Sequence, residues 1–543
     1  MTAYDRREGR RVTPGSGYAA EARAMIVDAM ARVPSARMVS RSLPLRTAAI
    51  GLAVVFVAAT LSGCGSLAAP QPTQGSATSN STPTHTPTPT AVQTYSTPTP
   101  GHTGSFGEGC PDGASMLPGA TCPPSQPPQI VPQPTSAHYG ETVDVDELVC
   151  VSCPTGNLRD RVSEVAADAG LALADSAEAD RPQARLTLKI GVAGLPAQGY
   201  RLAITRSKGV GADVTIQARD EAGGYYGLLS IAQLIVAAGG TARIRTATVE
   251  DHPSFLRRGL ILTADPLERV RFGVEYKLNF LYKRIQPNEP GMTELVAYCR
   301  SHYVTFMSLV GYRDYLTATP RADVEAVLAD QYDLGIRSFS LNFDDIWSGD
   351  PAALAASQAG AFNDFYAYLR SLDPTVEVAI TTGAYTGLPD KLSPAARTYL
   401  TLMKSKLPAD VLVFWTGDGG AFGITAAGAQ AYSTFVGHKI GLWDNDGIRF
   451  IDGRLPLSGR EADLATVIST YMANMADDKA WTGSNGQFAL LTELMYGWRP
   501  ETYDPFAARD LAEELLRSGG WVGPGPTRPT LPPASPLPLP SPS

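Results

Sequence analysis

The sequence lacks the features of several common protein classes. Its 45 Lys and Arg residues are outnumbered by 53 Asp and Glu residues, which gives a formal net charge of −8. Nucleic acid is therefore not expected as a partner, because phosphate binding needs a basic face. No G-x-G-x-x-G loop opens a helix, which argues against a dinucleotide site. A G-x-S-x-G nucleophile elbow is also missing.

Long apolar runs are missing as well, with one partial exception near the N-terminus. Arginines precede an apolar run from Ala48 to Leu61, which is short for a membrane span and typical of a signal peptide. The run ends in Leu-Ser-Gly-Cys, which resembles a bacterial lipobox and predicts cleavage before Cys64 and a lipid on its thiol. An ordinary signal peptide is the alternative. We therefore interpret residues 1–64 as an N-terminal extension and lipoprotein signal peptide, and expect a protein at the extracellular face of the membrane, lipid-anchored or secreted.

Cysteine is scarce, with six in the chain. Cys110 and Cys122 flank a Pro/Gly-rich loop, and Cys150 and Cys153 form a C-x-x-C pair. Two local disulfides are expected outside the cytoplasm, and a zinc site that uses both pairs is the alternative. Cys299 lies in a helix-like stretch and is predicted to be a buried free thiol.

Proline divides the chain into parts. Residues 65–138 are rich in Pro, Thr and Ser and are predicted to form a linker, and residues 521–543 a Pro-rich disordered tail. Residues 139–252 mix helix and strand patterns, which predicts a small α/β domain. Residues 253–520 alternate strands with helices, which predicts an α/β fold of the (β/α)8 TIM-barrel type. A doubly wound open sheet has the same rhythm, but the missing phosphate loop counts against it.

The eight predicted barrel strands allow the active site to be located, because catalytic residues of a barrel lie where its strands end. Acids, amides and aromatic residues occupy these positions, as expected of a carbohydrate site. Carboxylates transfer protons, amides bind hydroxyls and aromatic rings cover sugar faces. No His-rich set that could hold a metal is among them, and no cofactor is indicated. The residues are Asp344, Asp345, Tyr385, Trp415, Trp443, Asp444, Asn445 and Asn474.

The adjacent acids Asp344 and Asp345 favour one mechanism. Most glycosidases place two carboxylates on opposite sides of the scissile bond, which neighbouring residues do not easily do. They suit a substrate-assisted reaction, in which the sugar's 2-acetamido oxygen attacks the anomeric carbon. One acid then binds the acetamido N–H, and the other protonates the leaving oxygen and later activates water. The alternative is a strand end at which one Asp caps the next helix.

The stretch YDLGIRSFSLNFDDIW, residues 332–347, resembles the catalytic strand of glycoside hydrolase family 84, the β-N-acetylglucosaminidases that include O-GlcNAcases and enzymes described as hyaluronidases. The likeness extends over about residues 150–510 and includes GGYYGLLSIAQLI, EYKLNFLY, FWTG and LWDN. It implies that Asp344 orients and polarises the acetamido group and that Asp345 is the general acid/base. It also implies that four further residues contact the sugar. Tyr385 lines the acetamido pocket and Trp443 packs against that pocket. The other two are Asn445 and Asn474.

Three stretches depart from the family pattern. After Gly259 the chain reads LILTADP, where the family has Glu-Gly-Phe-Tyr-Gly. Gln286 falls nearest a sugar-binding lysine of the family, a role that Lys283 or Arg284 could take over. The family also has an Asp a few residues after LWDN, and no Asp occupies that position here. Phe450 stands at the expected spacing, and Asp452 lies two residues further on. We infer that contacts to the far hydroxyls are rewritten.

These observations predict an exported, retaining β-N-acetylglucosaminidase that acts on an amino-sugar glycan or glycoconjugate. Two alternatives stay open, a catalytically weakened barrel that binds amino-sugar glycans at the surface and a hyaluronidase-type glycosidase. Single residues also have structural alternatives. Tryptophan is often a core residue, which is the alternative for Trp415 and Trp443. Asparagine is common in turns, which is the alternative for Asn445 and Asn474.

Overall fold

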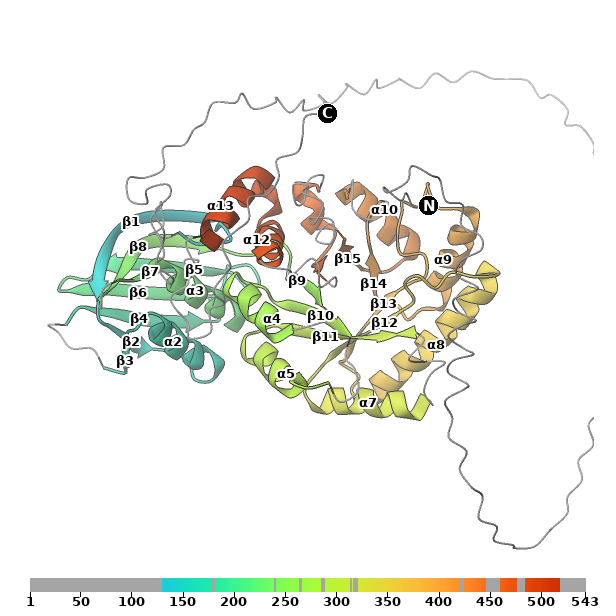
Figure 1. The fold of residues 1–543 in the computed structure, drawn as a ribbon, viewed down its shortest axis with the longest axis horizontal. Helices are drawn as coiled ribbons and strands as arrows, with labels where there is room; N and C mark the ends of the chain where they lie inside the picture. The colour runs from blue at the N-terminus through green and yellow to red at the C-terminus, as the bar shows by residue number, and fades with distance from the viewer. Residues whose placement is uncertain are drawn as a thin grey trace, which may run out of the picture. The chain divides into compact units, whose positions relative to one another are not determined.

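The computed structural model describes residues 129–176, 181–238, 241–262, 266–284, 289–312, 315, 321–418, 424–445, 460–475 and 484–517. They form a small mixed α/β domain followed by a closed barrel (Figure 1). The predicted signal peptide with Cys64, most of the linker, the tail, and Cys110 and Cys122 lie outside these residues. Within them, no helix has both the length and the apolar character needed to cross a membrane.

The small domain is built on an eight-stranded sheet. Seven of its strands follow the order β1-β8-β5-β6-β4-β2-β3, and the eighth, β7, pairs with β8. Ile130 and Val131 are already buried in its core, so the domain begins before the predicted boundary at residue 139. Its helix α3 begins at Glu221, because Asp220 accepts a hydrogen bond from the Gly223 N–H and so caps the helix. The elements are β1 (Ser136–Val145), β2 (Glu147–Ser152), α2 (Asn157–Asp168), β3 (Ala172–Ala174), β4 (Gln183–Ile190), β5 (Tyr200–Arg206), β6 (Gly211–Ala218), α3 (Glu221–Leu234), β7 (Ile235–Ala238) and β8 (Thr241–Asp251).

The barrel closes through parallel pairing of eight strands in chain order, with β16 returning to β9. This confirms the predicted barrel and excludes the open-sheet alternative. The strands are β9 (Arg257–Leu262), β10 (Phe280–Arg284), β11 (Thr305–Gly311), β12 (Ser338–Asn342), β13 (Glu377–Thr381), β14 (Leu412–Trp415), β15 (Ile440–Asp444) and β16 (Thr470–Asn474). The helices are α4 (Pro266–Glu275), α5 (Met292–Ser301), α7 (Arg321–Asp333), α8 (Pro351–Leu372), α9 (Pro394–Lys406), α10 (Ala426–Val436), α12 (Ser484–Trp498) and α13 (Pro505–Arg517), with the short 3-10 turns η2 (Ala462–Thr466) and η4 (Pro500–Thr502).

The barrel strands divide their side chains between two apolar clusters. Successive residues of a strand point to opposite faces, so every second side chain enters the barrel. The interior cluster consists of Ile261, Phe280, Tyr282, Met307, Ala379, Leu412, Phe414 and Met472. Their strand neighbours, such as Leu281, Leu341 and Leu442, belong to the larger core that includes the helices. This alternation decides which residues reach the mouth of the barrel.

A buried ion pair joins the last strand of the small domain to the barrel. Lys277 Nζ lies 2.9 Å from Oδ2 of Asp251, and both side chains are fully buried. Tyr200 donates to the same oxygen at 2.8 Å, and Trp498 Nε1 donates to Oδ1 at 2.9 Å. Asp251 therefore has hydrogen-bond partners from β5, from the α4–β10 connection and from α12.

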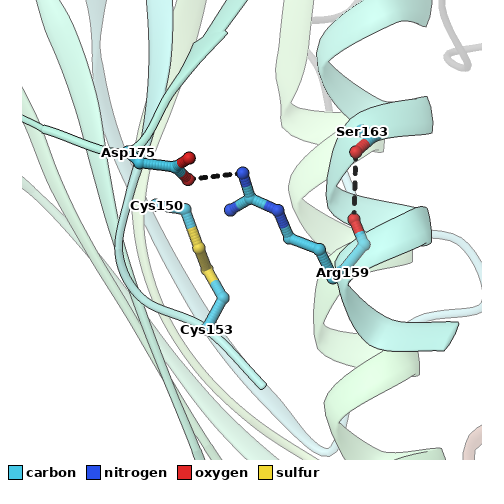
Figure 2. Close-up of a disulfide and its surroundings, with 5 residues drawn as sticks. All are labelled: Cys150, Cys153, Arg159, Ser163 and Asp175. Atoms are coloured by element: carbon cyan, nitrogen blue, oxygen red, sulfur yellow. Dashed lines mark hydrogen bonds and ion pairs between the residues drawn. A yellow bond between two sulfur atoms is a disulfide. The ribbon is translucent and has the colours of Figure 1, made fainter. Parts of the chain in front are cut away.

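A disulfide links Cys150 and Cys153 at the end of β2 (Figure 2). One of the two expected local disulfides is thus confirmed, and this pair is not free to ligate zinc. Beside it, the Arg159 guanidinium from α2 donates to Asp175 at 2.5 Å. Cys299 is a buried free thiol, as predicted, and burial raises its pKa to about 12.

Candidate active site

The acid pair lies in a tight turn directly after β12. The turn is fixed by two backbone hydrogen bonds, from Phe343 N–H to Thr381 O at 2.8 Å and from Ile346 N–H to Phe343 O at 3.1 Å. Asp345 has a φ of +58°, in the left-handed region that non-glycine residues seldom adopt. Such a conformation ends the strand abruptly. It is also the kind of backbone outlier found at functional sites.

The two carboxylates have different surroundings. Asp344 is partly buried, whereas Asp345 is exposed. Burial raises the pKa of Asp344, the neighbouring Asp345 charge raises it further, and the Arg284 guanidinium opposes both. Acids in unlike environments can hold different protonation states, which acid–base chemistry by two carboxyl groups requires.

Tyr385 reaches the acid pair from the loop after β13. Its hydroxyl donates a hydrogen bond of 2.8 Å to Oδ1 of Asp345. The loop is held by the Thr416 N–H, which donates to the Tyr385 carbonyl at 3.0 Å. Burial raises the pKa of Tyr385, and its bond to Asp345 acts in the same direction. The phenol therefore stays a neutral donor over the ordinary pH range.

A second group of predicted residues meets at the ends of β15 and β16. Trp443 Nε1 donates to Oδ1 of Asn445 at 3.0 Å, and Asn474 Nδ2 donates to the same oxygen at 2.9 Å. Trp443 is partly buried against the interior cluster, with its ring centroid 5.8 Å from that of Tyr282. An indole edge and an amide cluster are thus assembled at the same end of the barrel as the acid pair.

The structure places Trp415 away from this site. Its side chain is fully buried in the outer core, stacked on Tyr432 with ring centroids 5.5 Å apart. Its Nε1 donates to the Gly387 carbonyl at 3.2 Å. The preceding residue, Phe414, holds the inward position on β14. Since the indole offers no exposed face, the expected sugar-platform position is corrected to a core position.

Asp444 also turns outward, away from the barrel interior. It is fully buried and accepts a hydrogen bond from Arg460 Nε at 2.6 Å. Tyr471 donates to the same carboxylate at 3.3 Å. Of the residues at the end of β15, Trp443 and Asn445 therefore lie at the candidate site, and Asp444 packs on the outer side of the strand.

The site also includes inward residues that the sequence interpretation did not single out. Tyr282 donates to Asn342 Oδ1 at 2.5 Å, and its hydroxyl oxygen also lies 2.9 Å from Ser340 Oγ, which links β10 to β12 below the acid pair. Counting every second residue along β10 and β12 would have identified them. Lys283 points outward and pairs with Glu289 at 2.8 Å, whereas Arg284 is exposed at the end of its strand.

Other expectations fall outside the residues that can be described. These are Gln286, Phe450, Asp452 and the first residues after Leu262. In the described parts of the chain, no group of three or more His, Cys, Asp or Glu side chains is arranged to hold a metal ion.

Comparison with protein families gives two matches, one in each domain. Residues 282–517, from β10 to the end of α13, match the family model of β-N-acetylglucosaminidase. Residues 127–252, the small domain, match the model of glycosyl hydrolase family 20, domain 2. The prediction of a glycoside hydrolase of the β-N-acetylhexosaminidase type is thereby confirmed. The small-domain match begins close to the buried Ile130 and Val131, in agreement with the observed start of the domain.

Solved structures share the two-domain fold. CpGH84B matches with a TM-score of 0.57 and 18% identity, over 72% of this chain and 75% of that chain. CpGH84D matches with a TM-score of 0.53 and 16% identity, over 71% of each chain. A β-N-acetylhexosaminidase from Bacteroides fragilis NCTC 9343 matches with a TM-score of 0.51 and 13% identity, over 71% of this chain and 95% of that chain. At these identities the likeness concerns the fold.

Proposed function

We propose that this protein is a retaining β-N-acetylglucosaminidase of the family 84 type that removes terminal β-linked N-acetylglucosamine by substrate-assisted catalysis. The observation that carries the proposal is the pair Asp344–Asp345 in one turn at the mouth of the barrel. Two carboxyl groups on adjacent residues of one turn do not readily reach opposite faces of a glycosidic bond. A nucleophile supplied by the substrate removes that requirement.

In the first step, the acetamido oxygen forms a bond to the anomeric carbon while the bond to the leaving oxygen breaks. Asp345, in its protonated form, gives its proton to the leaving oxygen. Asp344 accepts a hydrogen bond from the acetamido N–H, which makes the carbonyl oxygen more nucleophilic and stabilises the positive charge of the oxazoline-like intermediate. In the second step, Asp345 takes a proton from a water molecule whose oxygen forms a bond to the anomeric carbon. The bond between that carbon and the acetamido oxygen breaks at the same time, which restores the acetamido group and the β configuration.

The remaining residues supply orientation. Tyr385 fixes Asp345 in the ligand-free protein and lines the acetamido pocket. The sugar-binding side consists of Trp443, Asn445 and Asn474. The Trp443 indole packs against the acetamido pocket, and the two amides form hydrogen bonds with sugar hydroxyl groups. We assign no sugar contact to Trp415, because its ring is fully buried.

The acetamido group itself provides the test. The full chain should hydrolyse an aryl β-N-acetylglucosaminide at least about 100-fold faster than the matching β-glucoside, which has no internal nucleophile. Fluorine on the acetyl methyl weakens the carbonyl oxygen, so the rate should fall with each fluorine added. Equal hydrolysis of both sugars would contradict the proposal. Binding of N-acetylglucosamine without turnover would favour the weakened binding module, and release of internal fragments from a polymer the hyaluronidase-type alternative.

We further propose that the enzyme is exported and lipid-anchored through Cys64. The support is the sequence Leu61-Ser62-Gly63-Cys64 after an apolar run, together with the Pro-rich stretch that follows. Expression in a bacterial host with labelled palmitate should label the full chain and not a Cys64→Ala variant. Equal labelling of both would refute the anchor, and export without labelling would favour an ordinary signal peptide.

A further inference from the structure

Trp347 is an exposed aromatic residue on the loop that carries the acid pair. Its exposed fraction is 41%, the largest of any tryptophan in the described parts of the chain. It follows Asp345 by two residues, so the two Cα atoms lie within about 7 Å of each other. An open indole is therefore available beside the carboxyl group that we assign as the general acid.

The Trp347 ring is held in place by neighbouring elements. Its centroid lies 5.2 Å from that of Tyr399 on α9, with the rings nearly perpendicular. The Tyr399 hydroxyl in turn accepts a hydrogen bond of 3.0 Å from the Gly383 N–H, just after β13. On the preceding residue, the Ile346 carbonyl accepts a bond of 3.2 Å from Gln358 Nε2 of α8. The indole is thus pre-positioned, which reduces the entropy lost when a ligand packs on it.

The loop after β13 connects this indole with the general acid. Tyr385, two residues after Gly383, donates to Asp345 at 2.8 Å. Asp345 is therefore bonded to this loop directly, and Trp347 contacts it through Tyr399. Both residues belong to the β12–β13 side of the barrel mouth.

The proposed sugar-binding amides lie on the other side of the mouth. The barrel closes in chain order, so β12 and β16 are four strands apart and opposite each other. Asn474 ends β16, and it bonds Asn445 at 2.9 Å. A sugar that extends from these amides to the acid pair has its anomeric carbon near Asp345, because the acid must reach the leaving oxygen. The aglycone then continues outward over the β12–β13 rim, where Trp347 lies.

We propose that Trp347 is a specificity-determining residue, a platform for the aglycone, and that the aglycone it selects is a second sugar ring. The inference rests on the proposed function and names its substrate class, a glycan that ends in β-linked N-acetylglucosamine. The open indole offers a flat apolar surface for the C–H face of a pyranose. A methyl group or a serine side chain has no such face.

Two substrates with similar leaving groups test the inference. Chitobiose and methyl β-N-acetylglucosaminide both release an alcohol, so both need protonation by Asp345, but only the first has a sugar aglycone. In Trp347→Ala, kcat/KM for chitobiose should fall about fivefold or more, and that for the methyl glycoside much less. Trp347→Phe should restore part of the loss. Phe506→Ala is the matched control, because Phe506 is 48% exposed on α13 and should leave both rates unchanged.

Two kinetic outcomes would overturn the inference. An equal loss with both substrates in Trp347→Ala would show that the residue only supports the acid loop. A larger loss with an N-acetylglucosaminyl-serine peptide than with chitobiose would assign the platform to a peptide aglycone instead.

Binding gives a readout that does not depend on turnover. Calorimetry with thio-linked chitobiose, whose sulfur bridge resists hydrolysis, should show weaker binding to Trp347→Ala by about fivefold or more. Binding of N-acetylglucosamine, which has no aglycone, should stay unchanged. Equal affinities of wild type and Trp347→Ala for the thio-disaccharide would overturn the platform. If the wild type hydrolyses neither substrate, the proposed function fails, and this comparison still decides the role of Trp347.

Discussion

The hydroxyl of Tyr385 donates a 2.8 Å hydrogen bond to Oδ1 of Asp345 from the loop that follows the adjacent strand. Tyr385→Phe keeps the ring and removes this bond. We expect kcat to fall about 10-fold or more, because hydrogen bonds to charged groups contribute about 1.5–3 kcal/mol. KM should change less, and thermal unfolding should be nearly unaffected.

The chain offers a matched control for this variant. Tyr366 on α8 also donates to a carboxylate, that of Asp410, at 2.9 Å, and the pair is exposed on the outside of the barrel. Tyr366→Phe should leave kcat and KM unchanged. If Tyr385→Phe behaves like this control, Tyr385 does not contribute to catalysis.

The sequence pattern predicted all eight barrel strands, because buried strands and amphipathic helices alternate clearly from β9 onward. It was less informative in the small domain. There β8 carries polar residues at alternating positions, and β1 follows a Pro-rich stretch, so neither was expected. Whether a pattern is recognised depends on how apolar the buried face of a strand is.

The site shows a similar limit. The acid pair was located because strand ends define the barrel mouth, whereas Trp415 was misplaced by one position of the alternation. In FWTG it is Phe414 that enters the barrel, and a one-residue difference reverses the face of every side chain. The bonds Tyr385–Asp345 and Tyr282–Asn342 join residues 40 and 60 positions apart, and nothing local in the sequence specifies them.

Asp344 should reduce stability at neutral pH. Burial and the Asp345 charge raise its pKa in the folded protein above the unfolded value. Its ionisation is therefore unfavourable for folding, and the loss of stability develops as pH rises from the unfolded to the folded pKa. Asp344→Asn should thus have a higher Tm than wild type at pH 7, and the difference should disappear near pH 3.

The control for this comparison is Asp330→Asn, on the exposed side of α7. It should show a much smaller change in Tm at both pH values. A wild-type Tm at pH 7 equal to or above that of Asp344→Asn would contradict the assigned electrostatics of the acid pair.

The buried pair Asp251–Lys277 should be essential for stability. Asp251→Ala leaves the Lys277 ammonium buried without its carboxylate, which typically costs about 3–5 kcal/mol. Urea unfolding followed by circular dichroism and tryptophan fluorescence would measure the loss. Arg271→Ala, which breaks the exposed pair with Glu294, should cost less than about 1 kcal/mol. A similarly small effect of Asp251→Ala would show that the junction does not depend on this pair.

The most direct test compares aryl β-N-acetylglucosaminides with good and poor leaving groups in wild type, Asp344→Ala and Asp345→Ala, with Asp330→Ala as control. Asp345→Ala should lose about 100-fold or more of kcat/KM with the poor leaving group and much less with the good one, because a good leaving group needs little protonation. Asp344→Ala should lose activity with both, because acetamido attack fails irrespective of the leaving group. Wild-type rates in either acid variant would contradict substrate-assisted catalysis by this pair.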